Sequence, residues 1–166
     1  MEIVAASVRG ARKWSGRVVD AHEGTPIEGV RVAIERPGFQ EKETIASTFT
    51  DAHGAFDLDG ANIGGAGLVL LAEGPLHASF ERPVPEPSTL EIALVLRKRR
   101  LLDRLVEWAR RRGPPFDGRA EPTPLQVQRA GDDRAAKWAK AVEQAAFDDV
   151  AVDARVEREV DDLEPR

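Results

Sequence analysis

The chain has 166 residues, of which 42% are hydrophobic and 32% charged, and a formal net charge of −5, a composition that is typical of a folded soluble protein and excludes general disorder. It has no cysteine, which excludes disulfide bonds and thiolate zinc sites; we expect a cytoplasmic protein, with a bacterial periplasm as the open alternative. No apolar run approaches the roughly 20 residues that span a bilayer, and residues 1–13 lack the apolar core of a signal peptide.

Short alternating stretches predict β-strands in the first part of the chain. The clearest runs from Val30 to Glu35, where Arg31, Ala33 and Glu35 alternate with hydrophobic residues and predict one buried and one solvated face. Because no helical pattern lies between the candidates, we expect an antiparallel β-sandwich of seven strands. The other six are expected at Trp14–Ala21, Ile45–Thr50, from Phe56 onward, Leu68–Ala72, His77–Val84 and Leu90–Leu96.

The hydrophobic period becomes helical after Leu96. Residues 101–109 place their leucines, Trp108 and Ala109 on one arc, which predicts an amphipathic helix that ends at Gly113. Thr123, Asp132 and Asp153 are each suited to cap the start of a further helix. We therefore expect an α+β chain whose sandwich is followed by three or four short helices, with Trp108 and Trp138 joining the helices to one another or to the sheet.

The segment 14–96 also carries an ordered set of turn and core residues. On this set it resembles the carboxypeptidase regulatory-like domains, whose fold is a seven-stranded sandwich of the transthyretin (prealbumin) type. The resemblance implies a non-catalytic accessory or interaction module. The matching residues are Gly16, Asp20, Gly24, Pro26, Gly29, Val30, Val32, Thr50, Asp51, Gly54 and Phe56.

Three stretches of the tail form a second pattern, namely Thr123-Pro124, Val142 to Phe147 and Val152-Asp153-Ala154. On these stretches residues 97–165 are similar to an uncharacterised helical domain at the C-terminal end of bacterial membrane proteins with transglutaminase-like domains. This resemblance implies a cytoplasmic tail whose membrane part is missing. We expect an N-terminal extension at 1–13, the sandwich at 14–96, and a helical region at 97–166 packed on itself or on the sandwich.

No catalytic arrangement can be proposed from the sequence. The hydroxyisourate hydrolases and intradiol dioxygenases share the transthyretin-type fold but depend on tyrosine, and this chain has none. The three histidines, His22, His53 and His77, have no ligand spacing and are interpreted as solvated turn residues. The stretch 57–62 lacks the third acid and terminal Glu of a calcium loop. We predict no catalytic, cofactor-binding or metal-binding residues, and no enzyme.

Two features are candidates for partner contacts. Phe39 lies in a Pro-Gly turn, where it either meets a partner or folds back over the end of the sandwich. The basic residues after Leu96 either bind an anionic membrane surface or pair with the acids between Glu143 and Glu164, and we favour pairing. Nucleic acid is not expected, because Trp108 lies on the apolar arc. The basic residues are Arg97, Lys98, Arg99, Arg100, Arg110, Arg111 and Arg112.

These observations predict a non-catalytic protein-interaction or scaffold module that acts as an accessory domain of a larger bacterial, membrane-associated system and binds a protein partner. Two alternatives stay open. One is a regulatory cytoplasmic tail of a transglutaminase-like membrane protein. The other is a protein that binds an anionic membrane surface through the basic helix.

Overall fold

The computed structural model describes residues 13–39, 41–60 and 67–166, which divide into two compact units. The first, the β-unit, ends at Leu94 and omits residues 75–78; the second, the helical unit, comprises residues 75–78 and 95–166. The expected N-terminal extension at 1–13 lies outside the described residues except for Lys13, which begins the first strand.

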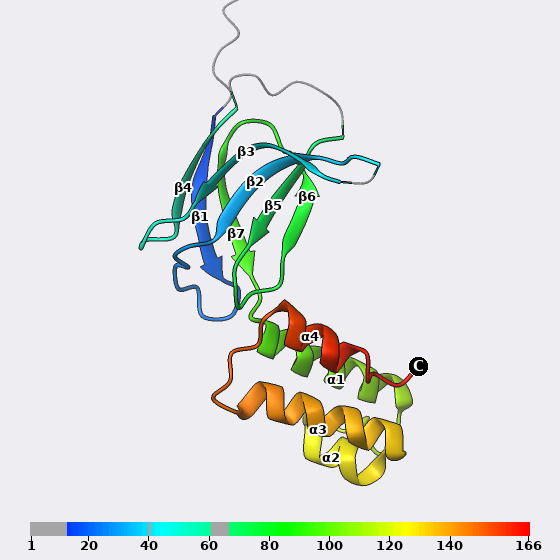
Figure 1. Ribbon diagram of the computed structural model, residues 1–166. Coiled ribbons are helices and arrows are strands. Elements are labelled where there is room, and N and C mark those ends of the chain that lie inside the picture. Colours follow the sequence, from blue (N-terminus) through cyan, green and yellow to red (C-terminus); the bar gives the residue numbers. More distant parts are fainter. Residues whose placement is uncertain (1–12, 40, 61–66) are drawn as a thin grey trace, which may run out of the picture. The chain divides into compact units, whose positions relative to one another are not determined.

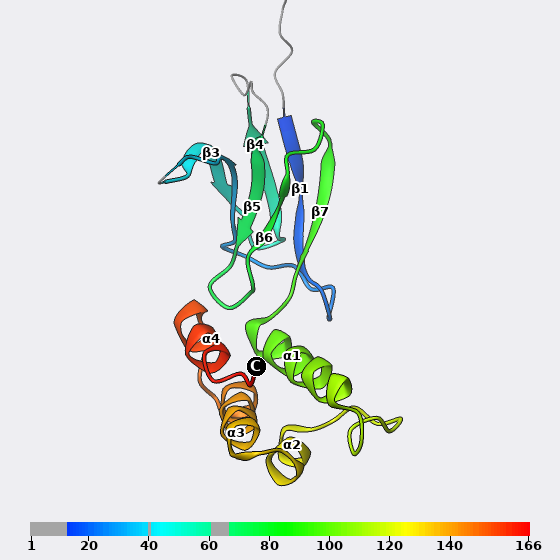
Figure 2. The same cartoon turned by 90° about the vertical axis from the view of Figure 1, so that its right-hand side faces the viewer.

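The β-unit has two sheets stacked face to face, seen from two directions in Figures 1 and 2. The three-stranded sheet has the order β4-β1-β7 and the four-stranded sheet the order β3-β2-β5-β6. The expected seven strands and two-layered sandwich are thus confirmed. The strands are β1 (Lys13–Asp20), β2 (Arg31–Arg36), β3 (Glu43–Phe49), β4 (Ala55–Asp59), β5 (Val69–Glu73), β6 (Phe80–Pro83) and β7 (Thr89–Leu94).

The core of the sandwich is built from the alternating hydrophobic residues of both sheets. Val32 and Ile34 on β2 and Leu70 on β5 face Val18 on β1, and all four side chains are fully buried. Trp14 closes one end of this core, where its Nε1 donates a hydrogen bond of 3.0 Å to the carbonyl oxygen of Pro85. The period-2 pattern therefore forms the inner face of each sheet.

The expectation of purely antiparallel sheets is wrong at one position. β1 and β7 pair in parallel, with Gly16 opposite Leu90 and Val18 opposite Ile92. The parallel pair needs no intervening helix, because the chain passes through the other sheet before it returns as β7. Only strands joined by a tight hairpin are obliged to be antiparallel.

The helical unit has four helices, α1 (Arg97–Arg112), α2 (Pro124–Ala130), α3 (Asp133–Phe147) and α4 (Ala154–Asp161). Their termini follow the predicted signals. Asp132 accepts a hydrogen bond from the backbone of Ala135, and Asp153 accepts from Arg155 and Val156. Thr123 and Gln126 form a reciprocal capping box at the start of α2. α1 ends at Gly113, which adopts a φ of 75°.

The helical unit has its own hydrophobic core, separate from that of the sandwich. Leu101 and Leu105 of α1 pack with Trp138 and Val142 of α3, and Val160 of α4 joins them. The apolar faces of the helices therefore pack on one another. Among the described residues, none of the helices has the length and apolarity that a membrane crossing requires.

A short segment from the sandwich sequence belongs to the helical unit. Residues 75–78 form backbone hydrogen bonds with the chain at the start of α1. The amide of Ala78 donates to the carbonyl oxygen of Val95 at 2.8 Å, and the amide of Arg97 donates to the carbonyl oxygen of Leu76 at 2.9 Å. The strand predicted from His77 therefore begins only at Phe80. The backbone of residues 76–78 bonds to residues 95–97, so β6 does not extend back to His77.

Candidate functional site

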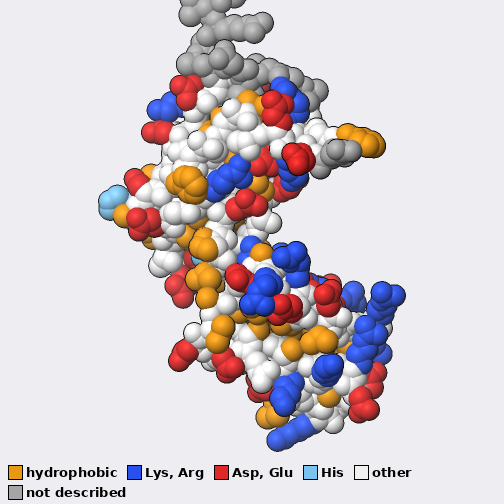
Figure 3. Space-filling view, in the orientation of Figure 1, with side chains coloured by type: hydrophobic (Ala, Val, Ile, Leu, Met, Phe, Trp, Pro, Cys, Tyr) orange, Lys and Arg blue, Asp and Glu red, His pale blue; other side chains and the backbone are white. Residues whose placement is uncertain are grey.

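Phe39 is the most exposed large hydrophobic side chain among the described residues, with an exposed fraction of 104%. It lies in the loop between β2 and β3, whose tip stands out with hydrophobic side chains in Figure 3. Phe39 does not fold back over the sandwich, so that alternative is wrong, and its contact with a partner stays a prediction.

Two ion pairs hold the loop that carries Phe39. Arg36 donates to Glu43 at 2.9 Å and closes the base of the loop. Lys42 donates to Glu81 on β6 at 2.7 Å, and this hydrogen bond raises the pKa of Lys42 above its ordinary value of 10.5. Both pairs are about half exposed, so each contributes little to stability.

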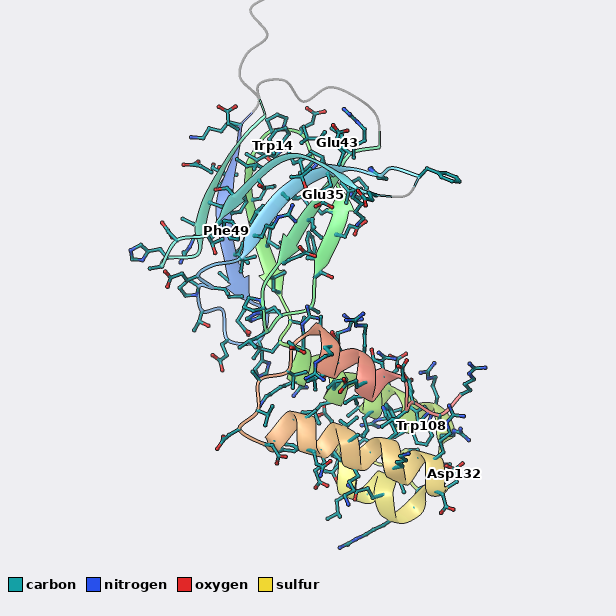
Figure 4. The ribbon with its side chains drawn as sticks, in the orientation of Figure 1. Trp14, Glu35, Glu43, Phe49, Trp108 and Asp132 are labelled. Atoms are coloured by element: carbon teal, nitrogen blue, oxygen red, sulfur yellow. The ribbon has the colours of Figure 1, made fainter. Side chains whose placement is uncertain are left out.

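The outer face of the four-stranded sheet is less solvated than the alternating pattern predicts. Arg31 is half-buried, Ala33 is fully buried, and Glu35 is 6% exposed. β2 is a central strand, so side chains of β3 and β5 cover it from both sides. The guanidinium of Arg31 donates to Glu35 at 3.1 Å and to Glu73 at 3.3 Å. Glu35 and Glu43 are labelled on this sheet in Figure 4.

Part of the basic helix α1 is neutralised by α4. Arg97 pairs with the buried carboxylate of Glu157, and Arg100 lies 3.5 Å from the same carboxylate. Arg104 pairs with Asp161 and with Glu164 beyond the end of α4. These residues recur every three or four positions on each partner, which places each set on one helix face. The expected pairing within the chain is confirmed for them.

Two neighbouring basic residues have other partners. Lys98 donates to the backbone carbonyl of Asp148 at 2.7 Å, and Arg99 pairs with Asp103 at 2.9 Å on its own helix. The first two turns of α1 therefore present few unengaged cationic donors.

The last turn of α1 is different. Arg110 donates to the backbone carbonyl of Gly118 at 2.8 Å and so fixes the loop after the helix. Arg111 has its closest acid, Glu107, at 4.0 Å, and the guanidinium of Arg112 lies 4.8 Å from the centre of the Trp108 ring. Among the described residues, Arg112 has no ion pair. Five of the seven predicted basic contact residues therefore have a close partner within the chain. The other two, Arg111 and Arg112, have no ion pair shorter than 4.0 Å among the described residues, and they are called the open pair below.

The open pair borders a surface hollow of about 570 Å³. The position of Trp108 near the end of the helical unit is marked in Figure 4. Sequence reasoning missed this hollow, because its walls come from α1 and from the last residues of the chain, which only the fold brings together. The hollow is lined by Trp108, Arg111, Arg112, Glu164, Pro165 and Arg166.

The three histidines lie in two kinds of environment. His22 and His53 are exposed in turns as expected, whereas His77 is buried and lies in the segment bonded to α1. Asp57 pairs with Lys13 at 3.1 Å. Nowhere in residues 13–39, 41–60 and 67–166 do three or more acids or histidines gather as metal ligands would. The stretch 57–62, which was compared with a calcium loop, lies partly outside these residues.

A scan against protein-family models finds no match to the chain, and a search of curated proteins finds none. Among solved structures, the 9R-lipoxygenase from Cyanothece PCC8801 is 10% identical, with a TM-score of 0.36 over 78% of this chain and 28% of that chain. The 5-hydroxyisourate hydrolase from Klebsiella pneumoniae is 26% identical, with a TM-score of 0.38 over 51% and 90% of the two chains. Transthyretin from Sparus aurata is 18% identical, with a TM-score of 0.31 over 49% and 89%.

These likenesses transfer neither a family nor an activity to the chain, because their TM-scores lie between 0.31 and 0.38. The chain spans little more than a quarter of the lipoxygenase. The two family resemblances in the sequence therefore stay predictions. The two-sheet sandwich of seven strands rests on the structure itself.

Proposed function

We propose that the chain is a non-catalytic protein-interaction module that engages a protein partner through Phe39. The observation that carries this proposal is the complete exposure of a phenylalanine in a loop flanked by two ion pairs. Burial of one such side chain contributes roughly 1.5–3 kcal/mol, so a partner with an apolar pocket gains substantially from this contact.

The surroundings of Phe39 favour a protein surface as the partner. Arg36, Glu43, Lys42 and Glu81 carry both signs of charge around the base of the loop. An apolar anchor within a mixed polar rim is the usual composition of an interface hot spot.

The membrane alternative receives less support from the same contacts. Arg97, Arg100 and Arg104 form ion pairs with acidic residues of α4. Among the described basic residues of α1, Arg111 and Arg112 remain available to an anionic surface. Two cations add only about 2 kcal/mol of attraction to an anionic leaflet. A protein partner at Phe39 is therefore the function that the geometry supports best.

Site-specific photocrosslinking tests the proposal. The full chain carries a benzoylphenylalanine in place of Phe39 and is irradiated in cells of its source. The matched control carries the same group at Phe147, a second phenylalanine, which is 68% exposed in the helical unit. We expect one discrete adduct from position 39 that is absent from position 147. Indistinguishable adduct patterns from the two positions would contradict the proposal.

The paired substitutions Phe39→Ser and Phe147→Ser provide the second measurement. Both change an exposed side chain, so both variants should retain the melting temperature of the wild type within a few degrees. The protein identified by crosslinking should bind Phe39→Ser on the order of tenfold more weakly and Phe147→Ser unchanged. Equal binding by the wild type and Phe39→Ser would rule out Phe39 as the anchor.

A further inference from the structure

The hollow beside Trp108 carries an inference that is independent of Phe39. Its volume of about 570 Å³ is within the range of small-molecule sites. A smaller hollow of about 370 Å³ adjoins it and shares Glu164, Pro165 and Arg166. The smaller one is also lined by Asp161 and Asp162, which make it unsuitable for an anion. The larger hollow is therefore the candidate site.

The charges that line the larger hollow are predominantly positive. Arg111 and Arg112 contribute two guanidinium groups; Arg166 contributes a third, which its own α-carboxylate in the structure offsets, and Glu164 contributes one carboxylate. That carboxylate is already engaged by Arg104. Figure 3 shows Lys and Arg side chains gathered at the end of the helical unit where the chain's last residue lies. An anion that enters the hollow would meet donors without having to displace a strong ion pair.

Stabilisation of the helix end explains only part of this cluster. Cationic side chains in a last turn interact favourably with the helix dipole, whose end carries about half a negative charge. Arg110 lies in this last turn and binds the following loop through Gly118. Arg111 and Arg112 add two further charges, and Arg166 comes from outside the helix. The two charges of Arg111 and Arg112 exceed the roughly half charge of one helix end, so positive charge remains on the side of the hollow that α1 forms.

The arrangement of Arg112 suits a phosphate group. The central carbon of its guanidinium lies 4.8 Å from the centre of the Trp108 ring, and this cation–π contact keeps the group beside the hollow. The planar guanidinium carries N–H donors in a fixed fork that matches two oxygens of a phosphate. The neighbouring Arg111 can supply a second pair of donors.

We propose that this hollow binds a phosphate group, which either a soluble phosphomonoester or a lipid headgroup can supply. Arg111 and Arg112 donate to the phosphate oxygens, and Trp108 positions Arg112. The site lies wholly within the helical unit, so its failure would leave the proposal for Phe39 intact.

Titration of the ¹⁵N-labelled full chain with glycerol 1-phosphate at low salt tests the proposal. The indole Nε1–H signals of the three tryptophans are followed separately. We expect the Trp108 signal to shift in a saturable way and the Trp14 signal, which belongs to the β-unit, to stay in place. No saturable shift with glycerol 1-phosphate, together with no binding to vesicles that contain phosphatidic acid, would overturn the proposal.

Substitutions assign the effect to the two arginines. Arg111→Gln/Arg112→Gln should weaken phosphate binding by more than about tenfold, because charge-assisted hydrogen bonds are lost. The control Arg119→Gln/Arg129→Gln makes the same charge change at exposed positions outside the hollow and should bind like the wild type. Equal weakening by the two pairs would show general charge attraction and contradict a site.

Two further arms complete the test. Arg112→Lys keeps the charge but loses the planar pair of donors, so it should also bind phosphate several-fold more weakly while the fold is retained. Binding to glycerol 1-phosphate identifies a soluble ligand. Binding only to phosphatidylcholine vesicles that contain phosphatidic acid identifies a lipid headgroup.

Discussion

The indole rings of Trp108 on α1 and Trp138 on α3 meet edge to face, with their centroids 5.6 Å apart and their planes at 69°. Trp138 is 1% exposed and Trp108 is 7% exposed. Edge-to-face contact is a favourable geometry for aromatic pairs and adds to the hydrophobic gain of burial. The pair confirms that the two tryptophans join helices to each other.

Replacement of Trp138 by alanine should strongly destabilise the helical unit. The substitution removes a large buried side chain and its contact with Trp108, and we expect a loss of about 3–5 kcal/mol in the free energy of unfolding. Denaturant unfolding followed by helical circular dichroism measures the loss. An unchanged unfolding midpoint would contradict a core position for Trp138.

Trp138→Phe is the matched control for this experiment. Within the part of the chain that the structure describes, the buried Nε1 of Trp138 has no hydrogen-bond partner. The phenylalanine variant therefore loses volume but no hydrogen bond, and it should cost clearly less than Trp138→Ala. A cost as large as that of alanine would indicate a polar contact of the indole nitrogen.

The ion pair between Arg97 of α1 and Glu157 of α4 should contribute far more to stability than the exposed pair Arg155–Glu159 within α4. Both side chains of the pair Arg97–Glu157 are nearly buried, at 11% and 7% exposure. Glu157→Gln leaves a buried guanidinium without its main counter-charge and should cost about 3 kcal/mol. The control is Glu159→Gln, whose partner Arg155 is 68% exposed; it should cost at most about 1 kcal/mol. Chemical unfolding measures the free energy of unfolding of both variants. Similar losses in the two would show that burial of the pair Arg97–Glu157 is not maintained in solution.

Acid should weaken the start of α4 through Asp153. Hydrogen bonds from the backbone amides of Val156 and Arg155 hold the pKa of Asp153 below its ordinary value of 3.8. A depressed pKa means that the ionised carboxylate stabilises the folded state above the unfolded pKa, and that this contribution disappears as the pH falls through the folded pKa.

Asp153→Asn keeps an acceptor for the cap but does not titrate. We therefore expect the wild type to be more stable than Asp153→Asn at pH 7 and the difference to vanish at about pH 2. Denaturant unfolding at pH 7, 4 and 2 measures it. A difference that is independent of pH would show that the cap is not ionised in the folded protein.

Gly16 on β1 should tolerate no side chain. A Cβ at this position would lie 1.9 Å from the carbonyl oxygen of Leu90, its partner on β7. Gly16→Ala must therefore separate the two parallel strands, at an expected cost of about 1–3 kcal/mol. Gly118→Ala is the control, because a Cβ there would have no atom within 4 Å, and it should leave the thermal unfolding midpoint nearly unchanged. Equal midpoints for the two variants would contradict the close pairing of β1 with β7.

Much of the fold could be predicted because local chemistry determines it. Thr123, Asp132 and Asp153 cap helices through their own side chains, and this requires no information from distant residues. The parallel pairing of β1 with β7 could not be predicted, since it depends on how the intervening strands divide between two sheets. The burial of Ala33 and Glu35 was missed for a related reason: the central place of β2 in its sheet is a property of the assembled fold.

The candidate sites, too, could be predicted only in part from the sequence. The exposure of Phe39 follows from its place in a Pro-Gly turn, although the sequence left two positions for the side chain open. Which arginines of α1 stay open depends on α4, whose acids lie about 60 positions further along the chain. Composition could show that basic and acidic segments are present, but it could not show which charges meet.

The bonds that join residues 75–78 to the start of α1 make the helical unit discontinuous in sequence. A gene fragment that encodes only residues 95–166 would therefore lack part of that unit, and a fragment that ends at residue 94 would keep four residues that belong elsewhere. The chain passes between the two units three times. A single proteolytic nick at any one passage leaves two further covalent connections, so exchange of either unit with another protein requires cuts at more than one position.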